Sequence, residues 1–312
     1  MSLRSFIFFF FALLPFFSFS QQSINVAKLK THVRYLSSEK LHGRLTGSQD
    51  ELTAAYYISK SFKSLGLIPK GNLSSYYYSY KFKQPQFKGD TVGGKLISGI
   101  NVAAFLDNHC DKTIIISAHF DHLGVFKNEQ GLLKAYPGAN DNASGMAGLL
   151  ELARYFAFNK KKEQFNILFI AFSGHEQGHI GAKLFCEEPT IDLNTVSFMI
   201  DLDMIGGMNA QSQLFVLGTD HFTDMNELIV NAKTDLNVQK KEMTYMSTDT
   251  EPFVKKNVKC ITFSTGINSD HHQLSDELKK LNFEDEKKVL DYLLMLISKL
   301  EEMPDYKCKQ KQ

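Results

Sequence analysis

The chain has 312 residues, of which 43% are hydrophobic and 22% are charged, with 20 glycines and 7 prolines. This composition is typical of a globular protein and excludes a disordered, low-complexity or collagen-like chain. The 35 Lys and Arg residues are balanced by 34 Asp and Glu residues. The chain therefore lacks the positive excess of a dedicated nucleic-acid-binding protein, and we expect no nucleic-acid partner.

Residues 1–20 differ in composition from the rest of the chain. Arg4 is their one charged residue, and an uncharged run of 12 residues extends from Phe6 to Phe17, interrupted by Pro15. A membrane-spanning helix needs ~20 apolar residues, so this run is too short for one. We interpret residues 1–20 as a signal peptide that is cleaved after Ser20. The mature protein is then expected to be exported, either periplasmic or secreted, without stable membrane insertion.

Two amphipathic helices are predicted next along the chain. Residues 24–40 carry apolar side chains at helical spacing, and residues 48–67 form a second such pattern. Ser48 is a suitable N-cap for the second helix, with Glu51 at the capping-box position. Gly66 is suited to its end.

Four apolar runs rich in β-branched residues predict strands that are buried on both faces. Helical patterns alternate with them, and this alternation predicts an α/β fold: a single doubly wound mixed sheet flanked by helices. The strands are expected at 113–118, 165–172, 196–202 and 260–265, and the helices at 144–158, 182–185, 222–233 and 283–300. We expect residues 304–312 to form a flexible tail.

The chain has four cysteines, and their spacing is too wide for a zinc knuckle or a C-x-x-C redox motif. In an exported protein they could form disulfides with three possible connectivities. Free, partly buried thiols are the alternative that we favour slightly. The four are Cys110, Cys186, Cys260 and Cys308.

Side chains that can bind a metal follow each predicted strand. Ligands of open α/β sheets bind beyond the carboxyl ends of the strands, so these side chains should meet at one edge. Each one alone has an ordinary structural role, such as an Asp that caps a helix. Carboxylates gathered at one edge, however, would repel one another unless a cation lay between them. The candidates are His119 and Asp121, His175 and Glu176, Asp203, the trio Asp270, His271 and His272, and Asp141 at the start of a helix.

This set of side chains indicates zinc, because Zn²⁺ binds imidazole nitrogen and carboxylate oxygen. Five ligands can hold two ions if one carboxylate bridges them. In such a site, with the ions ~3.5–4 Å apart, a hydroxide can be held between them and a carbonyl can be polarised.

The constellation resembles the dinuclear zinc aminopeptidases, a family that includes secreted bacterial aminopeptidases and is related to glutamate carboxypeptidase and glutaminyl cyclase. The resemblance covers roughly residues 25–300, with five motifs in the family's order. They are AHFDHLG (118–124), PGANDNASG (137–145), FSGHEQGHIGAKLF (172–185), MIDLDMIGG (199–207) and DHHQLSD (270–276). The segment YLSSEKLHGRLTGS (35–48) is also similar to the family.

The resemblance implies one phosphorylase/hydrolase-like zinc exopeptidase domain over residues 21–303. It also implies two zinc ions per chain, with the bridging carboxylate followed by an unusual backbone conformation at residue 142. His119 and Asp203 would bind one ion, Glu176 and His272 the other, and Asp141 would bridge them. Asp121 would orient His119.

The chain departs from the family pattern at three positions. His175 stands where the family has the glutamate that acts as general base, and His271 stands where a tyrosine commonly steadies the tetrahedral intermediate. In TDTEPF (248–253), Thr250 replaces a histidine. Imidazole can act as a base near neutral pH, but two nearby dications would disfavour its protonated form. We therefore expect weakened or pH-shifted catalysis, and positioned acid–base help is worth ~10²–10⁴-fold.

A competing motif is HEQGH, residues 175–179, which fits the H-E-x-x-H pattern of helical zinc proteases. In that interpretation His175 and His179 bind zinc and Glu176 is the base. We disfavour it because a predicted strand runs directly into the motif, and because it leaves the other candidate ligands unexplained.

The sequence thus predicts an exported zinc exopeptidase, most simply an aminopeptidase acting on peptides through a metal-bridging water. His175 would transfer the proton, and His271 and Asp121 would assist. Three alternatives stay open: a catalytically weakened or silent zinc-binding homologue, a glutaminyl-cyclase-like acyltransferase with one zinc, and a carboxypeptidase with a basic pocket.

Overall fold

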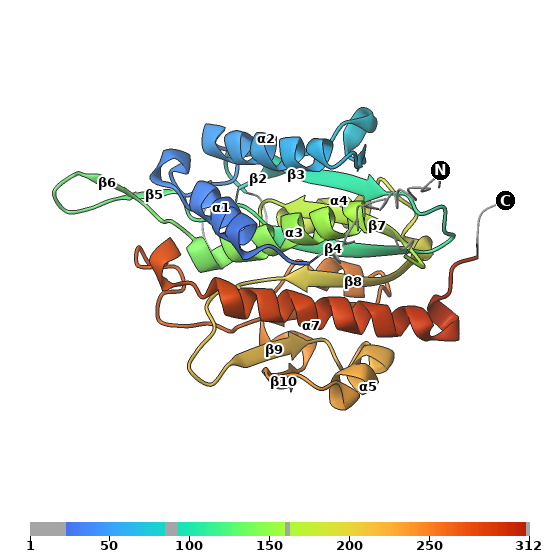
Figure 1. Ribbon diagram of the computed structural model, residues 1–312. Coiled ribbons are helices and arrows are strands. Elements are labelled where there is room, and N and C mark those ends of the chain that lie inside the picture. The colour runs from blue at the N-terminus through green and yellow to red at the C-terminus, as the bar shows by residue number, and fades with distance from the viewer. Residues whose placement is uncertain (1–22, 85–92, 160–162, 310–312) are drawn as a thin grey trace, which may run out of the picture.

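The computed structural model describes residues 23–84, 93–159 and 163–309, so the predicted signal peptide lies outside the described residues. A mixed sheet runs through the middle of the described chain (Figure 1). Its strands are β1 (Ile68–Pro69), β2 (Tyr77–Lys83), β3 (Leu96–Leu106), β4 (Thr113–His119), β7 (Asn166–Phe172), β8 (Val196–Leu202), β9 (Gln213–Leu217), β10 (Asn237–Lys241) and β11 (Cys260–Ser264).

The strand order in this sheet is β1-β3-β7-β4-β8-β11-β9-β10, with β2 also paired to β3. The central strands β7, β4, β8 and β11 are parallel to one another, while β3 and β9 join them antiparallel. The four predicted strands are these four central ones. The prediction missed the flanking strands, and β2 shows why: its buried residues alternate with more exposed ones, so it has no continuous apolar run.

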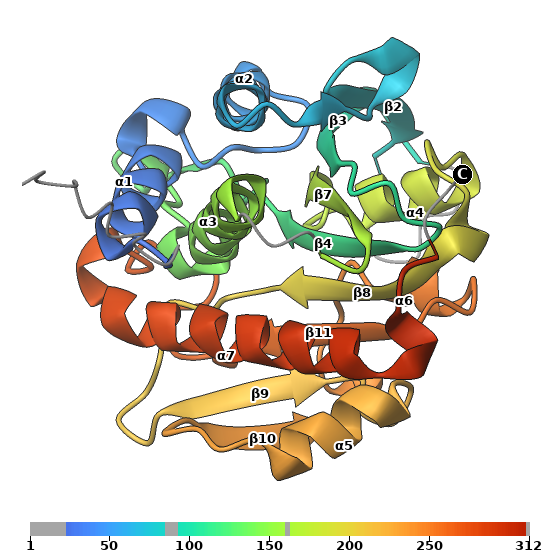
Figure 2. The same cartoon turned by 45° about the vertical axis from the view of Figure 1, so that its right-hand side comes forward.

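Helices cover both faces of the sheet (Figures 1 and 2), which confirms the predicted doubly wound α/β class. One face carries α1 (Val26–Leu36), α2 (Gln49–Ser64), α3 (Gly145–Phe158), α5 (Thr223–Asn231) and α7 (Phe283–Glu302), whose apolar side chains share one large core cluster. The other face carries α4 (Ile180–Glu187) and α6 (Glu251–Val254), whose Phe185 and Phe253 belong to a second core cluster.

The predicted cap of α2 is present in part, and its acid has a different role. Ser48 Oγ accepts a hydrogen bond from the Glu51 amide at 3.1 Å. The Glu51 carboxylate accepts from the Gly47 amide at 2.7 Å, from the Ile100 amide at 3.1 Å and from Ser173 Oγ at 2.5 Å. Burial raises the pKa of Glu51 to about 7. Glu51 thereby ties α2 to β3 and to the loop that follows β7.

The carboxyl ends of the central strands share one edge of the sheet, which we call the carboxyl edge. Parallel pairing requires this arrangement. A small hairpin of β5 (Val125–Lys127) and β6 (Leu133–Ala135) extends from the molecule beyond β4 and lies at the left of Figure 1. The far end of α7 lies at the opposite edge, which we call the amino edge.

Cysteine pairing corrects the prediction of free thiols for two of the four cysteines. Cys110 and Cys308 form a disulfide with a Cα–Cα distance of 5.3 Å, whereas Cys186 and Cys260 are free and buried. The two bonded residues are 198 positions apart. Their proximity depends on how the chain folds, and the sequence pattern carries no sign of it.

The described part of the expected flexible tail is packed against the domain. A short turn spans Pro304–Tyr306, and the Tyr306 side chain is buried with its ring 5.8 Å from that of Phe198 and 6.3 Å from that of Phe222. Together with the disulfide at Cys308, these contacts hold the segment in place. Within the described segments, none of the helices is both long and apolar enough to span a bilayer.

Candidate metal centre

The five predicted ligands converge at the carboxyl edge from five separate segments. His119 ends β4, Asp203 follows β8, Glu176 follows β7, Asp141 precedes α3 and His272 follows β11. His119 Nε2 lies 3.6 Å from Asp203 Oδ1 and 3.4 Å from Asp141 Oδ1. His272 Nε2 lies 3.2 Å from both Asp141 Oδ2 and Glu176 Oε2. Two imidazole–carboxylate pairs therefore share Asp141.

Asp141 presents one carboxylate oxygen to each pair, and its backbone is held from both sides. The Asn140 and Asp141 amides donate to the Asp276 carboxylate at 2.8 and 3.0 Å. The Asp141–Asn142 peptide bond is cis. Asn142 donates to the Leu202 carbonyl at 2.8 Å, joining this turn to the end of β8.

Several polar atoms at the centre of this group are buried and have no hydrogen-bond partner among the described residues. They include His119 Nε2, Asp141 Oδ2 and Asp203 Oδ1. Burial alone would lower the pKa of His119, but Asp121, Asp141 and Asp203 outweigh it and raise that pKa well above its usual value. The centre thus has a strong negative potential, and its orphaned donor atoms are those that zinc prefers. The residues present fit a zinc site.

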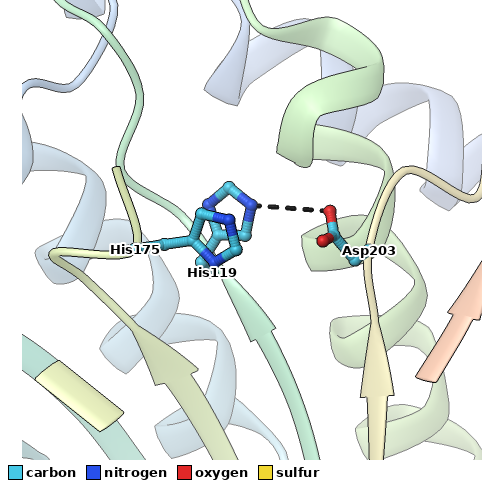
Figure 3. A group of neighbouring side chains, drawn as sticks. All are labelled: His119, His175 and Asp203. Atoms are coloured by element: carbon cyan, nitrogen blue, oxygen red, sulfur yellow. Dashed lines mark ion pairs between the residues drawn. The ribbon is translucent and has the colours of Figure 1, made fainter. Parts of the chain in front are cut away.

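His175 lies directly against this group (Figure 3). Its ring stacks on that of His119 with centroids 3.7 Å apart and planes 9° apart. Its Nδ1 lies 3.0 Å from Asp249 Oδ2. Burial and His119 both lower the pKa of His175, but the carboxylates of Asp249 and Asp203 outweigh them and raise it to about 9. His175 is therefore at the centre, with one ring nitrogen already bound to Asp249.

Asp249 is a residue that sequence reasoning missed, although it lies inside the segment TDTEPF that drew attention to Thr250. The Asp249 side chain is 1% exposed and faces His175. The Thr250 hydroxyl instead lies 2.6 Å from Thr248 Oγ1 and 3.2 Å from Met243 Sδ. The member of this segment that contacts the candidate centre is therefore Asp249, while the hydroxyl of Thr250 faces Thr248 and Met243.

Asp121 links the segments that carry the two halves of the site. Its Oδ1 accepts from the His175 amide at 3.2 Å, and its Oδ2 accepts from the Glu176 amide at 3.3 Å and from Thr46 Oγ1 at 2.9 Å. His119 Nδ1 lies 3.3 Å from the Asp121 carbonyl and 3.6 Å from its carboxylate. Asp121 therefore contacts His119 as expected, and it also fixes the loop after β7.

His271 and His272 form the more open side of the site. Their rings stack with centroids 3.8 Å apart, and His271 Nε2 lies 3.5 Å from Asp141 Oδ2. Their side chains are 28% and 39% exposed, against 1% for His119. Burial lowers the pKa of His271, whereas the adjacent carboxylates of Asp141 and Glu176 raise that of His272 to about 10. Asp270 is paired with Lys280 at 2.5 Å and does not join the centre.

Two further buried residues support the site, and both lie in motifs that the sequence had singled out. His122 Nδ1 lies 3.1 Å from Glu176 Oε1. Arg44 donates from Nε to the Phe120 carbonyl at 2.7 Å and from its terminal nitrogens to the carbonyls of Pro137 and Gly138 at 2.9 and 3.1 Å. Burial lowers the pKa of Arg44 to about 10. Arg44 thereby joins the segment after β4 to the turn that carries Asp141.

The helical zinc-protease interpretation of HEQGH is wrong. Residues 175–179 form a turn, and α4 begins only at Ile180. The two histidine rings of the motif meet edge to face with centroids 4.7 Å apart, and His179 has a φ of +59°. The motif needs both histidines on one face of a helix, and here no helix carries them.

Comparisons with known proteins agree with this geometry. The model of peptidase family M28 matches residues 101–297. A probable zinc metalloprotease of Pyrenophora tritici-repentis is 45% identical over 75 residues, which are 24% of this chain and 17% of that protein. The uncharacterized protein YfbL of Escherichia coli is 30% identical over 220 residues, 65% of this chain and 59% of that protein. The chain thus spans less than two thirds of these relatives.

Solved structures show the same fold. LapB from Legionella pneumophila has a TM-score of 0.68 at 23% identity, covering 89% of this chain and 72% of that one. A glutaminyl cyclase from Bacteroides thetaiotaomicron, bound to N-acetylhistamine, has a TM-score of 0.71 at 17% identity, covering 89% and 99%. A leucine aminopeptidase precursor from the same organism has 0.67 at 16%, covering 89% and 98%. With its family model matched over residues 101–297, the chain belongs to peptidase family M28, a zinc peptidase family.

Proposed function

We propose that this chain is an exported, zinc-dependent aminopeptidase with two zinc ions per chain. One observation carries the proposal: Asp141 directs Oδ1 toward His119 and Oδ2 toward His272, so a single carboxylate serves both halves of the site. His119 and Asp203 would hold one ion, and Glu176 and His272 the other. Bound zinc would supply polarisation of the scissile carbonyl and a lowered pKa of water.

His175 is the residue that transfers the proton in this proposal. Without metal the pKa of His175 is raised to about 9, but two bound zinc dications would disfavour the imidazolium and leave the ring neutral in the loaded site. The ionised Asp249 carboxylate can only accept a hydrogen bond, so His175 Nδ1 then carries the proton of the neutral ring and Nε2 keeps a free lone pair. Nε2 accepts a proton from the attacking water, and Asp249 stabilises the imidazolium that results. The same proton then passes to the leaving amine. Asp249 holds the base in one orientation, and this replaces the glutamate that the family pattern has at this position.

His271 is suited to the substrate carbonyl. It lies on the open side of the site, and its lowered pKa keeps the ring neutral, so that its N–H can donate to a developing oxyanion. The charges that converge on the centre come from carboxylates, among them Asp141, Asp203 and Asp249. Two bound zinc ions would offset these charges, so the preference for a substrate end with a free amine rests on the resemblance to the zinc aminopeptidases.

Export is proposed from residues 1–20 and is supported by the Cys110–Cys308 disulfide, because such bonds persist in oxidising compartments. N-terminal sequencing of protein recovered outside the cytoplasm should begin at Gln21. Recovery of the full-length chain in the cytoplasm would contradict this part of the proposal.

The activity is tested with purified chain lacking residues 1–20, assayed on aminoacyl-arylamides, on the same substrates with an acetylated amine, and on a glutaminyl substrate. We expect two zinc equivalents by elemental analysis and hydrolysis of the free-amine substrates. Hydrolysis of acetylated substrates alone would overturn the aminopeptidase assignment. Cyclisation of the glutaminyl substrate would make the chain an acyltransferase. Bound zinc without turnover, with a large gain of activity in His175→Glu, would make it a silent zinc-binding homologue.

A further inference from the structure

His122 is a fully buried imidazole that the reaction outlined above does not use. It follows β4 by three residues, and its side chain is 0% exposed. The ring packs against the backbone of Gly138, where a Cβ atom would lie 2.6 Å from the ring carbon Cδ2. Tyr136 approaches it edge to face with a centroid distance of 6.4 Å. The ring is therefore held tightly in one orientation.

The two ring nitrogens of His122 have different surroundings. Nδ1 lies 3.1 Å from Glu176 Oε1, whereas Nε2 is buried and has no hydrogen-bond partner among the described residues. An ionised carboxylate can only accept, so the proton of the neutral ring is on Nδ1. Nε2 is then a bare lone pair, which avoids a buried N–H without an acceptor.

The two carboxylate oxygens of Glu176 have different neighbours. Oε1 accepts from His122, while Oε2 faces His272 Nε2 at 3.2 Å and so points to the metal centre. The Glu176 amide is fixed separately by Asp121 Oδ2 at 3.3 Å. The amide bond alone leaves the carboxylate free to rotate about its own side-chain bonds, and His122 removes that freedom.

We propose that His122 is a positioning residue for the second zinc: it donates from Nδ1 to Glu176 Oε1 and so presents Oε2 as the ligand atom. The proposal rests on the zinc ligation of Glu176 proposed above. Partners of this kind are worth ~10–100-fold in metal affinity, because they orient the ligand before the metal binds.

A direct role of His122 as a ligand is the competing possibility, because its Nδ1 also lies 3.8 Å from Asp141 Oδ2. Nδ1 is closer to Glu176 Oε1, at 3.1 Å, and is within hydrogen-bond distance of it alone. The other nitrogen, Nε2, is buried, and the ring carbon Cδ2 beside it packs against Gly138. His122 therefore acts on the metal through Glu176.

The test compares two substitutions in the full mature chain, His122→Asn and His122→Gln. The Asn amide nitrogen takes the place of Nδ1 and can still donate a hydrogen bond to Glu176. The longer Gln side chain places its amide near the position of Nε2, where it cannot donate to Glu176. Zinc and cobalt titrations, with visible absorption of the cobalt-loaded protein, measure the affinity and geometry of each site. His32→Asn is the control, because His32 is a half-buried histidine of α1 whose Nδ1 lies 2.7 Å from Tyr57 Oη.

In His122→Gln we expect the second ion to bind ~10–100-fold more weakly with an altered cobalt spectrum, and the first ion to be unaffected. His122→Asn should keep the affinity of the wild type to within a few-fold. Wild-type affinity in His122→Gln would overturn the proposal. Equal loss in both variants would also overturn it, since His122 would then be a ligand itself. A wild-type chain that binds no metal would instead contradict the proposed function.

A second test uses the wild-type protein and therefore does not depend on whether a variant folds. Nitrogen-15 spectra of histidine-labelled protein distinguish the two neutral tautomers, and we expect His122 to carry its proton on Nδ1. A proton on Nε2 would overturn the proposal.

Discussion

The two edges of the central sheet differ in how completely their polar groups are satisfied. At the amino edge, Asn166 Oδ1 accepts from the amides of Asn108 and Cys110 at 2.9 and 3.2 Å, and its Nδ2 donates to the Cys110 carbonyl at 2.8 Å. Asp111 and Lys309 are hydrogen-bonded to each other, and the disulfide lies beside them. The hydrogen bonds and the disulfide therefore stabilise this edge of the sheet.

At the carboxyl edge, by contrast, several buried polar atoms have no hydrogen-bond partner among the described residues. The buried side-chain atoms without a hydrogen-bond partner in the described residues lie there, apart from Tyr292 Oη, and they belong to His119, His122, Asp141, Asp203, Asp249 and Glu286. Unsatisfied polar groups destabilise a fold, so they persist where a ligand compensates for them or where function requires them. The amino edge therefore stabilises the domain, whereas the carboxyl edge keeps buried polar atoms that a bound cation would satisfy. Four substitutions test this difference between the two edges.

Asp141→Asn should have the largest effect, because Asp141 serves both halves of the site. An amide carries no charge and offers one oxygen, so zinc content should fall and kcat/KM on an aminoacyl-arylamide should drop by at least ~10³-fold, several kcal/mol of transition-state stabilisation. The melting temperature of the chelated protein should also fall, because His119 and His272 hold the pKa of Asp141 well below its usual value in spite of its burial, so the carboxylate stabilises the metal-free fold. Elemental analysis, kinetics and thermal unfolding check this.

The matched control for this change is Asp111→Asn at the amino edge, where the carboxylate accepts from the Lys309 amide at 2.9 Å. It should leave zinc content and activity unchanged. Full zinc content in Asp141→Asn would contradict the bridging role.

Cys308→Ser should have the reverse pattern, with lost stability and kept activity. The disulfide closes a loop of 198 positions, and its removal should lower the free energy of unfolding by ~2–5 kcal/mol. Denaturant unfolding measures this, with Cys186→Ser as the control because Cys186 is a buried free thiol. If zinc binding were lost in Cys308→Ser at a temperature where it is folded, the two edges would not be independent.

Asp249→Asn should lower kcat by ~10²-fold at unchanged zinc content, because an amide N–H facing Nδ1 favours the wrong tautomer of His175. Asp220→Asn is the matched control. It removes the carboxylate of an exposed pair in which Asp220 lies 3.3 Å from His221. Should kcat stay at the wild-type value, His175 would not be the base, and the proton would take another route.

Glu286→Gln should have the smallest effect, on the pH dependence of stability. Burial raises the pKa of Glu286 well above its usual value. A carboxyl with a raised folded-state pKa stabilises the fold below its unfolded pKa of about 4.3, and this contribution is lost as the pH rises toward the folded value. The melting temperature of the wild type should therefore fall relative to Glu286→Gln between about pH 5 and pH 8.

The control for this measurement is Glu284→Gln, in the same turn of α7 but exposed. It should follow the wild-type curve. Parallel curves for Glu286→Gln and the wild type would show that Glu286 has a partner that compensates for its burial.

Much of the fold followed from the sequence because central parallel strands are buried on both faces and therefore read as apolar runs. β4, β7, β8 and β11 were found in this way, and the helical patterns predicted α3, α4, α5 and α7, whereas the short α6 was missed. The flanking strands β2, β9 and β10 were not, because a strand covered on one face mixes polar with apolar residues. The disulfide was missed for a different reason, since nothing local marks which of four cysteines will meet.

The side chains that could bind metal were predictable from the sequence, because ligand-type residues stand directly after buried strands and strand ends share an edge. The residues that orient these side chains could be identified only in the folded structure. His122 meets Glu176, and Asp249 meets His175, across 54 and 74 positions of the chain. A hydrogen bond between side chains depends on distances of a few tenths of an ångström, and no spacing along the sequence encodes them.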